Sequence, residues 1–197
     1  MIQELASSVT KWLERENAIS SENHALFAYA AYSLIFGLLP VFIVTAVGLA
    51  FGMIREGLIM ILPFMLIRKF SGGYHLNSSN ICIVLSTTVL ALALAFTKVI
   101  INEGYTAILS LLVLLSVVSL CVFSPIDNAA RKLTEREKQL FHKITCVLAT
   151  GFMALYLIMC RTLSVQYSVA FGVGILLSAV LQIPHTSKDL FSKSIKS

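Results

Sequence analysis

The chain has 197 residues, of which 57% are hydrophobic and only 13% are charged, and its formal net charge is +5. A soluble domain carries about 25% charged residues, so this composition excludes an ordinary soluble enzyme or binding module. We expect residues 1–197 to form a single all-α integral membrane domain.

Residues 1–20 predict an amphipathic helix. The apolar residues of this segment recur on one helical face, opposite the charged ones: Ile2, Leu5, Val9, Trp12 and Leu13. We expect this face to lie in the membrane surface, with Trp12 at headgroup depth. The same pattern also fits a helix that packs on the bundle without a binding role. Because charges interrupt the segment, we expect no secretory signal peptide.

Six apolar runs between residues 25 and 183 predict six transmembrane helices. They are Ala25–Met53, Gly57–Ile67, Ile81–Thr97, Tyr105–Phe123, Ile144–Cys160 and Leu163–Ile183. The second run is short, but it reaches spanning length from Met53 to Phe70 if the basic residues at its ends extend to the headgroups. Residues 184–197 follow as a tail.

The distribution of basic residues supports six spans with both termini in the cytoplasm. In this topology only Arg55, Lys98 and Arg161 of the 15 Lys and Arg residues lie outside. Omitting the second span would reverse the distribution and place most basic residues outside. The positive-inside rule therefore favours the six-span arrangement.

The segment between the fourth and fifth spans has clear boundaries. Pro125 predicts the end of the fourth helix, and Thr134 with Glu137 fits a capping box at the start of the fifth. The densest basic cluster of the chain lies here: Arg131, Lys132, Arg136, Lys138 and Lys143. Such a cluster sets topology and contacts anionic lipid, or it binds an acidic peptide.

The polar stretch SGGYHLNSSNIC, from Ser71 to Cys82, interrupts the apolar sequence. Gly72 and Gly73 allow a turn, and the Asn-Ser-Ser run that follows can cap a helix. In a continuous helix, His75 and Cys82 would lie about 10.5 Å apart along the axis, too far for a thiol and its base to form a hydrogen bond. The chain must therefore fold back between them if they react together.

A cap in residues 77–79 would place Cys82 in the first turn of the third span or just beyond it. The helix dipole and a nearby imidazolium would then favour its thiolate. A thiolate and an imidazole that protonates a leaving amine are the minimum groups for acyl transfer from a peptide bond. The alternative is that both residues are only tolerated at the interface. We expect Cys121, Cys146 and Cys160, which lie within or at the ends of apolar runs, to be buried packing residues.

The run Arg68 to His75, RKFSGGYH, followed by Cys82, resembles the signature of the accessory gene regulator B (AgrB) family of bacterial membrane endopeptidases. The chain size, the amphipathic N-terminus and the Ser124–Pro125 motif before a basic loop are also similar to this family. The resemblance implies an enzyme of the bacterial cell membrane that removes the C-terminal tail of a quorum-sensing peptide precursor and leaves a peptidyl thioester. A Cys or Ser within the precursor then closes a thiolactone or lactone ring.

The resemblance also implies residue roles. Cys82 is the nucleophile, His75 is the general base and acid, and Arg68, Gly72 and Gly73 are supporting positions. The expected partner is an AgrD-type precursor with an amphipathic N-terminus and an acidic tail. Arg131, Lys132 and Arg136 would attract that tail, and Arg68 either contacts its carboxylates or holds the second span at the headgroups. The resemblance also allows a homodimer, for which Gly48 and Gly52 provide one small-xxx-small spacing.

Several assignments stay open at this point. Asp127, Glu135 and Asp189 are candidates for orienting His75, and His142, His24 and His185 are weaker candidates for the base. We expect no cofactor, because a thioester retains the activation needed for ring closure, and no nucleic-acid partner. One alternative is a metal-dependent protease with His75, Cys82 and His142 as ligands. Another is a small transporter or a non-catalytic assembly module.

Overall fold

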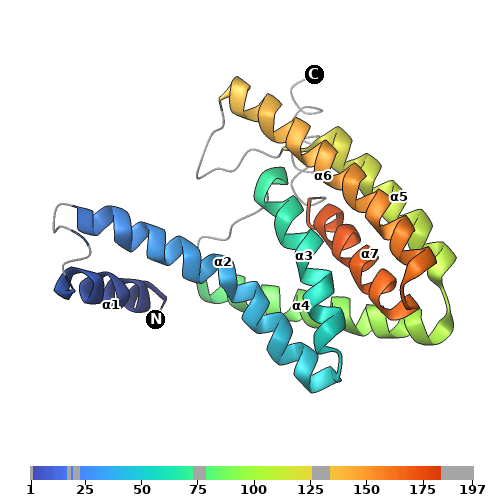
Figure 1. Ribbon diagram of the computed structural model, residues 1–197, viewed down its shortest axis with the longest axis horizontal. Coiled ribbons are helices and arrows are strands. Elements are labelled where there is room, and N and C mark those ends of the chain that lie inside the picture. The colour runs from blue at the N-terminus through green and yellow to red at the C-terminus, as the bar shows by residue number, and fades with distance from the viewer. Residues whose placement is uncertain (1, 17–18, 20–22, 73–78, 126–133, 183–197) are drawn as a thin grey trace, which may run out of the picture. The chain divides into compact units, whose positions relative to one another are not determined.

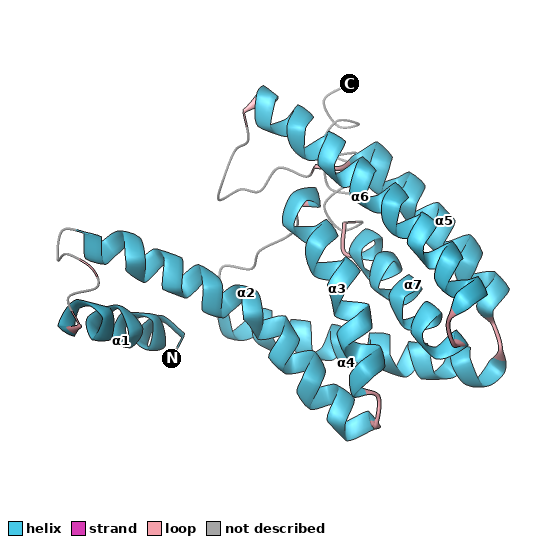
Figure 2. Ribbon diagram, viewed as in Figure 1, coloured by secondary structure: helices cyan, strands magenta, loops and turns pink. Residues whose placement is uncertain are grey.

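The computed structural model describes residues 2–16, 19, 23–72, 79–125 and 134–182 (Figure 1). All regular secondary structure in these ranges is helical, without a strand (Figure 2). The all-α prediction is confirmed. The helices are α1 (Ile2–Arg15), α2 (His24–Phe51), α3 (Ile54–Ser71), α4 (Ser79–Glu103), α5 (Thr106–Phe123), α6 (Glu135–Thr162) and α7 (Val165–Val180).

Each of the six apolar runs corresponds to one of the helices α2 to α7, and the chain is a multi-pass membrane protein. In the described ranges, α2, α5, α6 and the part of α4 from Ile83 to Glu103 are long and apolar enough to cross a bilayer. The helices α3 and α7 are not among these candidate spans, each for its own reason. α3 carries Arg55, Glu56, Arg68 and Lys69 near its ends, and the 16 residues of α7 extend only about 24 Å. The exact number of six spans stays a prediction.

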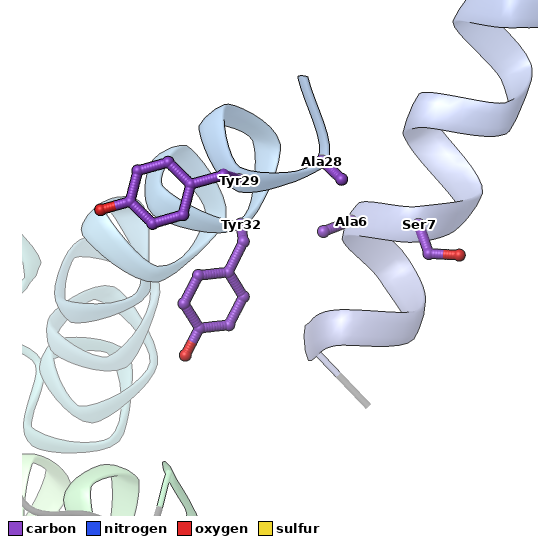
Figure 3. Close-up of a pocket in the computed structure, with 5 residues that line it drawn as sticks. All are labelled: Ala6, Ser7, Ala28, Tyr29 and Tyr32. Atoms are coloured by element: carbon purple, nitrogen blue, oxygen red, sulfur yellow. The ribbon is translucent and has the colours of Figure 1, made fainter. Parts of the chain in front are cut away.

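The chain divides into two compact units, residues 1–43 and 44–197, which we describe separately. The prediction that residues 1–197 form a single domain is not tested by this division. In unit 1, α1 buries Ala6 and Thr10 and exposes Leu5, Val9 and Trp12, the last at 59%. An open pocket of about 380 Å³ is lined by Ala6 and Ser7 of α1 and by Ala28, Tyr29 and Tyr32 of α2 (Figure 3). The side of α1 that lines this pocket thus carries small side chains, while much of its apolar face stays exposed.

α7 is the central helix of unit 2, and it packs against α3, α4, α5 and α6. Two glycines make this close packing possible. A Cβ atom at Gly174 would collide with the carbonyl oxygen of Met60, and one at Gly172 would lie 2.8 Å from the Tyr156 ring. Small residues are the usual means by which membrane helices approach each other closely. A short helix enclosed by its neighbours can be apolar on all sides, which is why the sequence of α7 shows little amphipathic pattern.

The turn between α2 and α3 uses both glycines of the proposed dimer motif. A Cβ atom at Gly48 would lie 3.1 Å from the Met53 carbonyl oxygen, and Gly52 has φ 69°, a left-handed conformation that favours glycine. These roles account for both residues within one chain. The homodimer stays a prediction.

Candidate functional site

The predicted interruption between α3 and α4 is present in the described backbone. α3 ends at Ser71, and Gly72 follows with φ 77° and ψ −172°, a combination that is essentially restricted to glycine. α4 begins at Ser79, so Cys82 is its fourth residue. One continuous helix from Ser71 to Cys82 is therefore excluded, and Cys82 lies at the start of a helix as the sequence predicted.

Several predicted site residues lie outside the described residues. These are Gly73, His75, Arg131 and Lys132, together with the weaker candidates Asp127, His185 and Asp189. For Cys82 the helical backbone is described but the side chain is not. The contact between His75 and Cys82 therefore stays a prediction.

The described residues next to this segment form a polar cluster where four helices meet. It consists of Ser71 at the end of α3, Ser124 directly after α5, His142 in α6 and Gln182 just after α7, and we call it the Gln182 node. The side-chain amide of Gln182 donates to Ser124 Oγ at 2.7 Å and to the Ser71 carbonyl oxygen at 3.5 Å. Ser71, Ser124 and Gln182 are 1%, 6% and 2% exposed. Helices α3, α5 and α7 thus end where α6 begins, which agrees with alternating spans.

His142 binds within the node through both ring nitrogens. Its Nδ1 lies 2.8 Å from the Ser124 carbonyl oxygen, and its Nε2 lies 3.7 Å from Cys146 Sγ. Since a carbonyl only accepts, Nδ1 is the donor in the contact with Ser124. These contacts assign His142 to linking α6 with α5. His24, the other described candidate for a base, pairs with Glu14 at 3.1 Å in unit 1.

The three cysteines predicted to be buried packing residues differ from one another. Cys121 and Cys146 are partly buried, and Cys146 Sγ lies 3.9 Å from the Cys121 carbonyl oxygen. Cys160 is exposed, so the prediction of burial is wrong for this residue. A uniformly apolar membrane helix does not reveal from its sequence which face meets protein and which meets lipid.

Basic side chains surround this end of unit 2. The Phe70 and Phe141 rings pack edge to face at 6.1 Å and bring the last turn of α3 against the first turns of α6. This places Arg68 and Lys69 of α3 at the same end as the exposed Arg136 and Lys143 of α6. The Arg68 guanidinium lies over the Phe64 ring at 5.8 Å. That contact holds the side chain along its own helix and fits either role predicted for it.

The start of α6 has the predicted cap. The Thr134 amide donates to Glu137 Oε2 at 2.9 Å, and the Glu137 amide donates to Thr134 Oγ1 at 3.4 Å. Glu135, a candidate for orienting His75, accepts from Lys138 Nζ at 3.1 Å and is exposed. The capping box is confirmed, and the one described carboxylate candidate is engaged in the first turn of α6.

Gln182 is the residue that our sequence reasoning missed. It lies near the end of the apolar run Leu163–Ile183, and an amide side chain in such a run can indicate an interhelical hydrogen bond. In the described part of the chain, no three His, Cys, Asp or Glu side chains are placed to hold a metal ion. This does not test the alternative set of His75, Cys82 and His142, because the first two side chains lie outside that part.

Comparison with known proteins identifies the family. The family described as accessory gene regulator B matches residues 6–184. Over 89 residues the chain is 32% identical to "Putative AgrB-like protein" of Clostridium perfringens strain SM101 / Type A, and 30% identical to "Putative AgrB-like protein 2" of strain 13 / Type A. Each alignment covers 45% of this chain and 42% of the relative, so the chain spans about two fifths of the length of these relatives. No solved structure matches.

Proposed function

Because the chain belongs to the accessory gene regulator B family, we propose that it is a membrane-embedded cysteine endopeptidase of the bacterial cell membrane. Its substrate is an AgrD-type quorum-sensing precursor with an amphipathic N-terminus and an acidic tail. The protein removes that tail and promotes formation of a thiolactone or lactone ring. The reaction takes place near the cytoplasmic face and uses no cofactor.

The proposed chemistry transfers one acyl group twice. The Cys82 thiolate attacks the carbonyl carbon of the scissile peptide bond, and His75 protonates the leaving amine as the C–N bond breaks. The precursor is then bound to Cys82 as a thioester. A Cys or Ser side chain within the precursor attacks this thioester, His75 accepts its proton, and Cys82 leaves as a thiolate. The thioester supplies the activation for ring closure, so the cycle requires no nucleotide.

The observation that carries this proposal is the position of Cys82 as the fourth residue of α4, beyond a helix break at Gly72. The first amides of a helix lack intrahelical acceptors, and the dipole at this end stabilises negative charge. Both effects favour a thiolate and can stabilise the oxyanion of an attacked peptide bond. The family signature Arg68 to His75 immediately precedes this helix start.

Substrate binding is proposed to use the basic end of unit 2. Arg68 at the end of α3 and Arg136 in the first turn of α6 lie at this end, and Arg131 and Lys132 precede α6 in the chain. A planar guanidinium can bind a carboxylate of the tail through two hydrogen bonds. Gly72 and Gly73 would let the chain turn so that His75 reaches Cys82.

The primary test is tail release, measured by mass spectrometry on the full-length protein in liposomes. The substrate is the peptide of a neighbouring short reading frame that encodes an amphipathic segment, an internal Cys or Ser and an acidic end. Cys82→Ala and His75→Ala should each abolish release, whereas Cys121→Ala, Cys146→Ala and Cys160→Ala should retain it. Full activity in Cys82→Ala would refute the proposal.

A second arm tests the covalent intermediate. A precursor whose internal Cys or Ser is replaced by Ala cannot close the ring, so it should accumulate on Cys82 as a thioester. Hydroxylamine should release this adduct as a hydroxamate of the tail-less precursor, which has a defined mass. Tail release without any adduct or hydroxamate would exclude acyl transfer through Cys82.

A further inference from the structure

We propose that Gln182 and Ser124 are positioning residues for the segment Gly72–Cys82. This inference rests on the proposed function, because it concerns how that segment is held for reaction. The side-chain amide of Gln182, bound to the Ser124 hydroxyl, fixes the last carbonyl group of α3 at Ser71. In doing so it sets the direction in which the chain enters the segment.

Gln182 is 2% exposed at the end of an apolar helix, where an amide without partners would be strongly destabilising. Its side-chain nitrogen has two described acceptors, Ser124 Oγ at 2.7 Å and the Ser71 carbonyl oxygen at 3.5 Å. The shorter bond fixes the amide on α5, and the longer bond reaches α3.

The carbonyl group that receives the longer bond lies at the end of α3. The last four carbonyl groups of a helix have no intrahelical donor, and Ser71 is the final residue of α3. Gln182 supplies a donor from another helix at this position. The next residue, Gly72, has the left-handed backbone that redirects the chain. A bond to Ser71 therefore acts one residue before the turn, where a small rotation changes the direction in which the chain leaves α3.

The backbone of Ser124, the residue that anchors Gln182, is itself held by two hydrogen bonds. The Ser124 carbonyl oxygen accepts from His142 Nδ1 at 2.8 Å, and the Ser124 amide donates to the Leu120 carbonyl oxygen at 3.1 Å. The hydroxyl that fixes Gln182 is thus held by its own helix and by α6. Displacement of a reacting group by about 1 Å can reduce a rate roughly 100-fold, so a rigid anchor here has a catalytic consequence.

The test compares Gln182→Met and Ser124→Ala with wild type in the full-length protein. Gln182→Met keeps the side-chain length and removes the donor, and Ser124→Ala removes only the acceptor hydroxyl. Both variants should reduce kcat for tail release roughly 10- to 100-fold, with KM within about twofold, because position and not precursor binding is affected. Ser124→Thr retains the hydroxyl and should recover most of the rate.

Alkylation of Cys82 by iodoacetamide gives a readout that needs no precursor. Peptide mass spectrometry follows Cys82 separately from the other cysteines as pH is varied. In wild type, reaction should begin at a pH below that of an ordinary thiol. In Gln182→Met and Ser124→Ala, the midpoint of the rate profile should move to higher pH, because the proposed pairing of His75 with the Cys82 thiol would be weakened.

Ser110→Ala is the matched control. It removes a hydroxyl from an interhelical bond of 2.9 Å to Tyr156, near the other end of the α5–α6 pair. The fall in its Tm shows how much the loss of one interhelical bond destabilises the protein when the end of α3 is not affected. Its alkylation midpoint should equal that of wild type. Equal effects of Ser110→Ala and Ser124→Ala on kcat and midpoint would overturn the inference.

The outcomes also separate this inference from the proposed function. Wild-type kcat and midpoint in folded Gln182→Met and Ser124→Ala would overturn the positioning role, while an inactive Cys82→Ala would leave the endopeptidase in place. Full activity of Cys82→Ala would instead refute the endopeptidase. An unchanged alkylation profile would then refute the positioning role independently.

Discussion

Two interhelical hydrogen-bonded contacts near opposite ends of the α5–α6 pair differ in what they hold. Near one end, Ser110 Oγ and Tyr156 Oη lie 2.9 Å apart, and Ser110 also donates to the Thr106 carbonyl oxygen at 2.9 Å. At the other end, Ser124 and His142 belong to the Gln182 node, whose bonds reach backbone carbonyls where α3 and α5 terminate.

The difference indicates which contact can affect chemistry. The Ser110–Tyr156 contact joins two helices within their length, and the Tyr156 ring packs against Gly172 of α7. Its loss should weaken packing without redirecting the chain. The Gln182 node contacts the last residue of α3 directly before the Gly72 turn, so we expect its loss to change the direction in which the chain leaves α3. We therefore expect stability and activity to respond separately at the two ends.

The largest loss of stability should come from the packing of α7. In Gly174→Ala the new Cβ would collide with the Met60 carbonyl oxygen and lie 2.8 Å from Pro63 Cγ. Because a backbone carbonyl cannot move aside like a side chain, we expect a loss of about 3 kcal/mol, or roughly 6–12 °C in Tm. Thermal unfolding in detergent measures this shift.

Gly151→Ala in α6 provides the control for that prediction. No atom outside the local helix backbone lies within 4 Å of a Cβ placed at Gly151. Alanine also has the higher helix propensity, so this variant should be as stable as wild type or slightly more so. A Tm in Gly174→Ala equal to that in Gly151→Ala would show that α7 is not packed as described.

A smaller effect on stability is expected from Tyr156→Phe. The variant removes the bond to Ser110 and leaves the buried ring in place, so unfolding should become easier by about 1 kcal/mol. Tail release should keep its kcat and KM, because this contact lies away from the Gln182 node. The liposome assay measures kcat. A reduced kcat would contradict the expectation that the Ser110–Tyr156 contact affects stability but not activity.

Much of the fold could be predicted because hydrophobic run length is a strong signal. All of the helices α2 to α7 coincide with predicted runs, and the boundaries at Gly72, Pro125 and Thr134 followed from backbone chemistry and capping. The amphipathic pattern of residues 1–20 likewise predicted α1. Local rules are enough for these features.

Features that depend on neighbouring helices were harder to predict. The sequence did not reveal that α7 is central, that Ala6 of α1 is buried, or that Cys160 is exposed. Lipid and a protein interior are equally apolar, so hydrophobicity does not distinguish a lipid-facing side from a protein-facing side. For the site, the resemblance to a family motif identified the Gly72–Cys82 segment. Gln182 lies 100 residues or more from this segment in the sequence, so its contact with Ser71 could be found only in the structure.

At the exposed start of α6, Thr134→Ala should remove one half of the capping box. We expect a loss of about 1 kcal/mol, because the Glu137 amide loses its acceptor, while Thr134→Ser should be close to wild type. The Gln182 node lies further along α6, at His142, so kcat should change by less than about twofold. Tm and tail release measured on the same preparations test this; a large fall in kcat would show that the cap supports the node.

The smallest expected effect is a change in KM after reversal of one basic charge at either end of α6. Arg136 and Arg161 are both exposed, one in the first turn and one near the end of this helix. If the acidic tail of the precursor binds at the Gln182 end, Arg136→Glu should raise KM about two- to threefold at low salt, and the increase should fade at about 0.5 M salt as screening shortens the range of the charge. Arg161→Glu changes the net charge equally and should leave KM unchanged at every salt concentration. Equal increases in both variants would mean that net charge, and not the basic end of unit 2, attracts the precursor.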